Sequence, residues 1–291
     1  MTILAIYNIK GGVGKTATAV NLAYLSAREG YRTLIWDLDP QGATSFYFRV
    51  RAKVKGGAKK LIAGKRDLEK VIRGTDFESL DLLPADFSYR NLALLLGRAK
   101  RPEERLARLL IPLAPHYDYV FIDCAPGSSL VSESVFVAAD ALVVPTVPTT
   151  LSLLTLERIR KRIAKMERRQ PRLFPFLCMV DRRRGLHRDV RDQVFADGEF
   201  LSAQIPYASV VEKMGLHRAP LATFAGGSEP ALAYEALWEE IKGRLRREKD
   251  EREPAPRDED AIKTDHPVPA GDETGMDDGG PRATSTRDDP R

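Results

Sequence analysis

The feature that most constrains the fold of this chain is a glycine-rich turn that joins an apolar run to a helical pattern. The run Thr2–Asn8 is rich in β-favouring residues, and the turn Lys10–Thr16 reads Lys-Gly-Gly-Val-Gly-Lys-Thr. Apolar residues recur at helical spacing over Lys15–Glu29, and a second buried strand, Arg32–Trp36, leads into Asp37. A strand, a glycine turn, a helix and a strand within about 37 residues predict a right-handed βαβ unit.

The rest of the chain alternates continuous apolar runs with amphipathic helical patterns. Apolar runs without polar alternation are typical of parallel strands that are covered on both faces. We therefore expect an α/β fold with a doubly wound, mostly parallel sheet and helices on both faces, in one domain over residues 1–247. The expected strands are Leu80–Pro84, Tyr119–Ile122, Ala141–Val144, Phe174–Val180 and Phe200–Ile205, and the expected helices are Ser88–Leu96, Glu103–Leu110, Leu151–Arg168, Leu186–Phe195 and Glu229–Arg246.

Charge is distributed unevenly between this domain and the last residues of the chain. Residues 248–291 contain 14 acidic and 7 basic residues, a net charge of −7, and are rich in proline and glycine. The whole chain has 46 basic and 41 acidic residues, so residues 1–247 hold 39 basic and 27 acidic residues, a net charge of +12. A tail with few large apolar residues cannot offset its ordering entropy, so we expect disorder there. The basic body favours a polyanion as partner.

The composition of this chain is not typical of a membrane protein or a secreted protein. The chain has no run of about 18 apolar residues, and its acidic, proline-rich end carries no basic amphipathic helix, so we expect no membrane partner. The apolar stretch at the N-terminus is too short for a signal peptide. The two cysteines, Cys124 and Cys178, lie in apolar runs and are expected to be buried thiols of a cytoplasmic protein.

The glycine turn has the chemistry of a phosphate-binding loop. Glycines allow backbone N–H groups to point toward phosphate oxygens, where a Cβ would obstruct them. The helix that begins there adds its positive N-terminal dipole. We expect Lys15 to reach the β- and γ-phosphates and the Thr16 hydroxyl to bind Mg²⁺. The generic pattern has a glycine where this chain has Ile9, and it lacks the additional lysine at Lys10.

Three segments together resemble the ParA/MinD family of deviant Walker A P-loop ATPases, which includes Soj-like proteins. They are the turn with its additional Lys10, the segment Trp36–Gly42, and the strand and turn Phe121–Gly127. The resemblance extends along residues 1–245 and is to the small ParA type, because no helix-turn-helix extension precedes the first strand. We therefore do not expect base-specific repressor activity.

The resemblance implies roles for the residues of these segments. Asp123 would hold Mg²⁺ through water and Asp37 would support the metal, while Asp39 would orient or activate the attacking water. Lys10 would reach across a dimer interface to the partner's nucleotide, so that loss of the γ-phosphate weakens the dimer. The implied catalytic residues are Lys10, Lys15 and Asp39, the metal site is Thr16, Asp37 and Asp123, and the nucleotide site is Lys10, Gly11, Gly12, Val13, Gly14, Lys15, Thr16, Ala17 and Pro206.

Three basic stretches compete as a surface for nucleic acid. They are Arg158–Arg162 on a helix, Arg182–Arg184 in a loop after a strand, and a connector within residues 49–60. Together with the charge of the body, they favour sequence-independent contacts with DNA phosphates.

A fourth segment, Ile205–Lys213, resembles a family stretch that usually bears arginines implicated in DNA binding. In this chain Tyr207 and Val210 stand in their places. Either other cations supply the contact or the protein binds DNA weakly or not at all. The candidate DNA-binding residues are Arg182, Arg183, Arg184, Lys213 and Arg218.

We predict an ATPase with low basal turnover that dimerises with ATP and positions or partitions a plasmid, a chromosome region or another large cargo. Its expected cofactors are ATP and Mg²⁺, and its expected partners are a second copy, non-specific DNA, and an adaptor or ParB-like stimulating protein. A synthetase of the cobyrinate or dethiobiotin kind is disfavoured by Lys10 and the segment Asp37–Gln41. An electron-transfer ATPase of the nitrogenase iron-protein type is disfavoured because neither Cys124 nor Cys178 is placed to bind a cluster.

Overall fold

The computed structural model describes residues 1–64, 67–167 and 169–250. Residues Met1–Lys249 form one compact unit. The predicted acidic tail, 248–291, lies outside the described residues from residue 251 onward, so its disorder stays a prediction. In the described ranges no helix is both long and apolar enough to cross a membrane.

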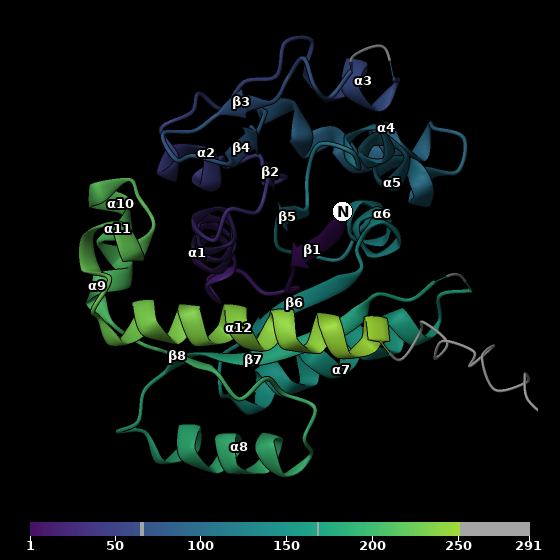
Figure 1. The fold of residues 1–291 in the computed structure, drawn as a ribbon. Coiled ribbons are helices and arrows are strands. Elements are labelled where there is room, and N and C mark those ends of the chain that lie inside the picture. The colour runs from purple at the N-terminus through teal and green to yellow at the C-terminus, as the bar shows by residue number, and fades with distance from the viewer. Residues whose placement is uncertain (65–66, 168, 251–291) are drawn as a thin grey trace, which may run out of the picture. The chain divides into compact units, whose positions relative to one another are not determined.

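Within the described residues eight strands form one sheet: β1 (Thr2–Ile6), β2 (Thr33–Asp37), β3 (Arg73–Gly74), β4 (Leu80–Leu83), β5 (Tyr119–Asp123), β6 (Ala141–Thr146), β7 (Arg172–Val180) and β8 (Gln204–Pro206). Their spatial order is β3-β4-β2-β5-β1-β6-β7-β8 (Figure 1). Neighbours are parallel except β3 and β4. The central strands read as continuous apolar runs because both of their faces are covered. The predicted doubly wound α/β fold is confirmed.

The helices of the described residues are α1 (Lys15–Arg28), α2 (Ala43–Tyr47), α3 (Gly57–Ile62), α4 (Leu92–Gly97), α5 (Arg105–Leu110), α6 (Leu130–Ala138), α7 (Thr150–Ala164), α8 (Gly185–Ala196), α9 (Ser209–Glu212), α10 (Met214–His217), α11 (Leu221–Ala225) and α12 (Glu229–Asp250). Three 3₁₀ turns are η1 (Phe87–Asn91), η2 (Pro102–Glu104) and η3 (Ile111–Leu113). On one face of the sheet α1 and α12 form a hydrophobic cluster with β1, β2, β4, β5, β6, β7 and β8 (Figure 1). On the other face α4 to α8 form a second cluster with the same sheet.

The parallel topology brings the ends of three strands to the glycine turn. In register, Ile6 of β1 and Asp37 of β2 are both partners of Asp123 of β5. Because each connection between parallel strands returns over a face of the sheet, their carboxyl ends meet at one edge, where ligands of such sheets bind. We call this the carboxyl edge.

The predicted strands and longer helices are present with shifted ends, except that only Gln204 and Ile205 of the strand predicted over Phe200–Ile205 lie in a strand, β8. Several short elements are not predicted. The helix expected over Ser88–Leu96 begins as the 3₁₀ turn η1 and becomes α4 at Leu92. Helix α6, which begins with a reciprocal cap between Ser129 and Ser132, is not among the predicted elements. Serine takes the place of the usual glutamate or glutamine in this capping box, so the sequence signal for a helix start is weak.

Candidate functional site

The glycine turn between β1 and α1 has the backbone conformation that its sequence requires. Gly12 and Gly14 have φ angles of 70° and 91°, in the left-handed region that favours glycine. A Cβ built on Gly14 would lie 2.8 Å from Sγ of Cys178 on β7. Both the backbone conformation and the packing of β7 against the turn therefore require glycine at this position.

Asn8 fixes the turn to the sheet. Its Nδ2 donates to the carbonyl of Pro145 on β6 at 2.9 Å, and its Oδ1 accepts from the Lys10 N–H at 3.0 Å. Asn8 is buried, so these bonds satisfy polar groups that water does not reach. This role of Asn8 is not predicted from the sequence, because an asparagine after a strand is equally typical of an ordinary turn.

The two lysines of the turn lie in different surroundings. Lys15 is 7% exposed, its Nζ donates to the carbonyl of Lys10 at 2.8 Å, and burial lowers the pKa of its ammonium. Nζ of Lys10 lies 3.5 Å from Oγ of Ser152, near the start of α7. A buried ammonium folded over the turn is placed to neutralise a phosphate. The reach of Lys10 into a second subunit remains a prediction.

Two buried carboxylates occupy paired positions at the ends of β2 and β5. Asp37 and Asp123 are both 0% exposed. Oδ2 of Asp37 accepts hydrogen bonds from the N–H and the hydroxyl of Ser45, each at 2.7 Å. Oδ2 of Asp123 accepts one from the hydroxyl of Thr44, also at 2.7 Å. In the described part of the chain, Oδ1 of each carboxylate has no hydrogen-bond partner.

These unpartnered oxygens fit a divalent cation. Burial and then the charge of Asp123 raise the pKa of Asp37 to about 7. Burial also raises the pKa of Asp123 to about 6, which the hydroxyls of Thr44 and Thr16 partly oppose. Carboxylate oxygens are ligands that Mg²⁺ prefers, and a cation there would stabilise both ionised forms. Thr16, Asp37 and Asp123 are therefore brought together as the predicted metal site requires.

Asp39 lies beyond β2, in the loop that leads to α2. Its Oδ1 accepts from the N–H of Gln41 at 2.9 Å, a turn that fixes the direction of the carboxylate. Asp39 is half-buried, and its charge acts on both Lys15 and Asp123. The structure thus places it at the same edge as the predicted metal site. Its action on water stays a prediction.

The remaining residues predicted for the nucleotide also lie around this edge. Gly11 and Val13 belong to the turn, and Ala17 lies in the first turn of α1. Pro206 ends β8 and is in register with Val180 of β7, beyond the Cys178 that contacts the turn. Contact of Pro206 with a nucleotide stays a prediction.

The arginines predicted to bind DNA after β7 are exposed but engaged in ion pairs. Arg182 pairs with Glu229 at 2.9 Å. Arg183 and Arg184 both pair with Asp181, at 3.0 and 3.6 Å. Exposed pairs of this kind contribute little to stability, so phosphates could displace the carboxylates at small cost.

The other two DNA candidates lie in the short helical segment after β8. Lys213 is exposed. Arg218 donates its Nε–H to the carbonyl of Phe46 at 3.1 Å, and its guanidinium carbon lies 4.6 Å from the centre of the Phe46 ring. Arg218 therefore ties this segment to α2, a packing role that the sequence analysis does not predict.

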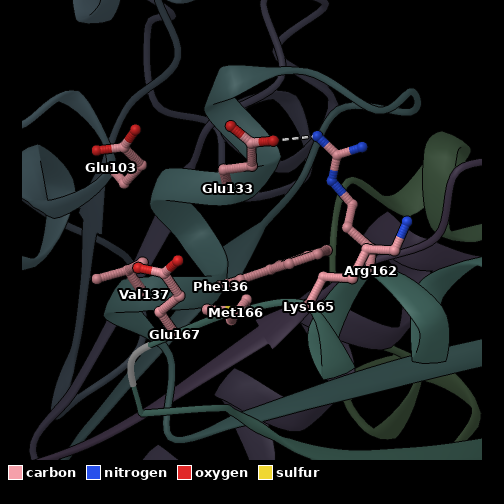
Figure 2. Close-up of a pocket in the computed structure, with 8 residues that line it drawn as sticks. All are labelled: Glu103, Glu133, Phe136, Val137, Arg162, Lys165, Met166 and Glu167. Carbon is pink, nitrogen blue, oxygen red and sulfur yellow. Dashed lines mark hydrogen bonds and ion pairs between the residues drawn. The ribbon is translucent and has the colours of Figure 1, made fainter.

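A separate hollow of about 470 Å³ lies between α6 and α7 (Figure 2). Apolar side chains of Phe136 and Met166 meet the charged side chains of Glu133 and Arg162, which form an ion pair there. None of the residues predicted for the nucleotide or the metal lines this hollow, whereas Arg162 belongs to the basic stretch Arg158–Arg162 that is a candidate surface for nucleic acid. Because acids and bases are mixed along it, its chemistry indicates no particular ligand.

The sequence is similar to those of chromosome partitioning proteins. A family model described as an AAA domain matches residues 1–174. The sporulation initiation inhibitor protein Soj of Bacillus subtilis is 38% identical over 144 residues, which cover 49% of this chain and 57% of Soj. The chromosome partitioning protein ParA of Caulobacter vibrioides is 32% identical over 206 residues, which cover 67% of this chain and 76% of that protein.

Two solved structures have a similar fold. A complex of Cyanothece McdA with ATP matches with a TM-score of 0.74 at 18% identity, over 83% of this chain and 96% of McdA. The cobyrinic acid a,c-diamide synthase of Mycobacterium smegmatis, with an ATP analogue and magnesium, matches with a TM-score of 0.70 at 26% identity, over 87% of this chain and 97% of the synthase. The likeness to McdA concerns the fold alone.

Proposed function

The chain belongs to the ParA/MinD family of P-loop ATPases, and on this premise we propose that it is an ATP-dependent dimerisation switch that positions or partitions a large cargo. The cargo would be a plasmid, a chromosome region or a large protein assembly. The observation that carries the proposal is the meeting of a glycine turn and two buried carboxylates at one edge of the sheet. That combination suits a nucleoside triphosphate with its magnesium ion.

ATP and Mg²⁺ are the ligands that we assign to this site. The N–H groups of the turn and the ammonium of Lys15 would bind the phosphates. Thr16, Asp37 and Asp123 would hold the ion, directly or through water. The bound ion would neutralise charge on the β- and γ-phosphates. Phosphoryl transfer requires mainly this positioning and neutralisation, so the site needs no covalent intermediate.

Hydrolysis and the switch depend on two further residues. Asp39 is proposed to orient or activate the water that attacks the γ-phosphorus. Lys10 is proposed to contact phosphates on the nucleotide of a second copy, so that ATP favours the dimer and ADP does not. We expect slow basal hydrolysis that a partner accelerates.

Light scattering after gel filtration tests the switch. With a non-hydrolysable ATP analogue and Mg²⁺, the protein should have about twice its monomer mass of 32.4 kDa, and with ADP it should have the monomer mass. A monomer under both conditions would contradict the proposal, because the switch requires that ATP favours the dimer over the monomer.

The proposed partners beyond a second copy are non-specific DNA and an adaptor or ParB-like stimulating protein. The positive charge of residues 1–247 supports DNA, because phosphate contacts need cations and no particular sequence. We expect a cytoplasmic protein that associates with the nucleoid when ATP is bound. Binding of the ATP form to random-sequence duplex should weaken steeply with salt, and binding that does not respond to salt would exclude this contact.

An ATP-dependent synthetase of the cobyrinate or dethiobiotin kind is the second candidate. The likeness to the cobyrinic acid a,c-diamide synthase, at 26% identity over 87% of this chain, favours it. An enzyme of that kind would hydrolyse ATP only with its acceptor and would not dimerise in response to the nucleotide. Basal ATPase activity in protein stripped of small molecules separates the two candidates.

A further inference from the structure

Two consecutive hydroxyl side chains connect the short helix α2 to the carboxylates of the site. The hydroxyl of Thr44 donates to Oδ2 of Asp123, and that of Ser45 donates to Oδ2 of Asp37, both at 2.7 Å. All four residues are 0% exposed. Adjacent residues on one element thus each hold a carboxylate, and the two carboxylates lie on neighbouring strands.

These hydrogen bonds engage one oxygen of each carboxylate, and they do not involve the other oxygen. In the part of the chain that the structure describes, Oδ1 of Asp37 and Oδ1 of Asp123 have no hydrogen-bond partner. A buried polar oxygen without a partner is costly, and a bound cation would compensate that cost at both positions. Because Oδ2 is held, rotation of the carboxylate is restricted and Oδ1 remains the oxygen that a cation can reach.

The helix that carries the hydroxyls is itself anchored. Its N-cap, Gly42, adopts a left-handed conformation with φ of 71°. The Ala85 N–H, just beyond β4, donates to Oγ of Ser45 at 3.0 Å. At the other end, Arg218 donates to the carbonyl of Phe46 at 3.1 Å. The hydroxyls therefore lie on a helix that is bonded to the segments after β4 and after β8.

We propose that these two hydroxyls are positioning groups that hold Asp37 and Asp123 in the orientation that binds the magnesium ion of the nucleotide. The inference rests on the proposed function, because it presupposes a site for ATP with Mg²⁺. Hydrogen-bond partners of metal ligands orient those ligands, and their loss typically lowers metal affinity about 10–100-fold. In this proposal Asp37 and Asp123 remain the metal ligands, and α2 sets the orientation of their carboxylates.

The variant Thr44→Val tests the proposal, because valine has nearly the same shape and no hydroxyl. Mn²⁺, a paramagnetic substitute for Mg²⁺, is titrated by electron paramagnetic resonance into full-length protein saturated with a non-hydrolysable ATP analogue. We expect about tenfold weaker Mn²⁺ binding in Thr44→Val and recovery in Thr44→Ser. Affinity for a fluorescent ATP analogue in EDTA should not change, whereas a general packing defect would weaken metal-free binding as well.

Ser45→Ala is the second variant, and it decides the matter if Thr44→Val does not fold. Asp37 then keeps the backbone N–H of residue 45, so we expect a smaller, severalfold loss of Mn²⁺ affinity. Mn²⁺ affinity within about twofold of the unmodified protein in every folded variant would overturn the proposal. If the unmodified protein binds neither the analogue nor Mn²⁺, the proposed function fails instead, so the two failures are distinguishable.

Discussion

The carboxylate pair at the ends of β2 and β5 and the arginine loop after β7 are both charged and both follow parallel strands, but they differ in burial. Asp37 and Asp123 are 0% exposed, and each is held through one oxygen. The side chain of Arg183 is 87% exposed and pairs with an acid two residues away. The first region is organised by residues from several elements, whereas Arg183 and Arg184 in the second pair with Asp181 of their own loop.

This difference in burial determines how strongly one substitution can change affinity or stability. Removing water strengthens every electrostatic contact in the buried region and makes an unpaired group there costly. In the exposed region water and salt compensate for most of a lost contact. Substitutions in the two regions should therefore differ in the size of their effects, and the following experiments test this contrast.

The largest effect is expected for Lys15→Ala, which removes the buried ammonium from the glycine turn. Loss of one partner of a buried charge pair costs about 2–5 kcal/mol, so ATP affinity should fall by about thirtyfold to several thousandfold and the ATP-dependent dimer should disappear. Isothermal titration with ATP and Mg²⁺ measures the affinity, and light scattering measures the dimer. A dimer that persists in this variant would show that the turn does not control assembly.

The next effect is expected for Asp39→Ala, at the half-buried margin of the site. Its carboxylate is assigned to water rather than to the nucleotide, so ATP binding should survive while turnover falls at least about a hundredfold. The dimer should then accumulate with ATP itself, as we expect it to do with the analogue in the unmodified protein. Phosphate release at the unmodified rate would show that another group orients the water.

A smaller effect, on folding stability, is expected for Gly14→Ala. The new Cβ would lie 2.8 Å from Sγ of Cys178, at a φ angle of 91°. Overpacking and left-handed strain together should lower the free energy of unfolding by about 2–4 kcal/mol. Denaturation in urea measures this loss. Gly12→Ala is the matched control, because φ is 70° there but no atom lies within 4 Å of the new Cβ. Equal losses of unfolding free energy in the two variants would mean that the contact with Cys178 on β7 does not contribute to the destabilisation.

The same contrast explains which parts of the site the sequence predicts. Asp37, Asp39 and Asp123 follow apolar strands directly, so the pattern of each strand also gives the edge at which its carboxylate lies. Thr44 is not predicted, because its partner Asp123 lies 79 residues away and nothing local marks the pair. Fold and phosphate site thus follow from local patterns, whereas the supports of the site depend on tertiary packing.

Surface charge is predicted least well, because the sequence gives the number of cations but not their partners. Arg218 counts as a free cation in the sequence, yet it is bonded to the carbonyl of Phe46 and stacked on its ring. Arg182 is paired with Glu229, a residue 47 positions along the chain, at 2.9 Å. Such pairings arise only when distant elements meet, so a net charge of +12 in residues 1–247 does not locate a DNA surface.

The smallest effect is expected for Arg183→Ala in the exposed loop. A phosphate contact there must displace Asp181, so DNA affinity of the ATP form should fall only a few-fold, equally for all sequences. The slope of log affinity against log salt should decrease by about 1, since one fewer counterion is released. Fluorescence anisotropy with random-sequence duplex measures both quantities.

The control for that experiment is Arg32→Ala at the opposite edge of the sheet, just before β2. Arg32 is also exposed and paired with an acid, Asp118, at 2.8 Å, so its loss changes the net charge equally. If DNA contacts lie at the carboxyl edge, Arg32→Ala should leave the salt slope unchanged, because only local phosphate contacts release counterions. Equal changes in both variants would mean that DNA senses the total charge of the protein, and the arginine loop would then have no special role.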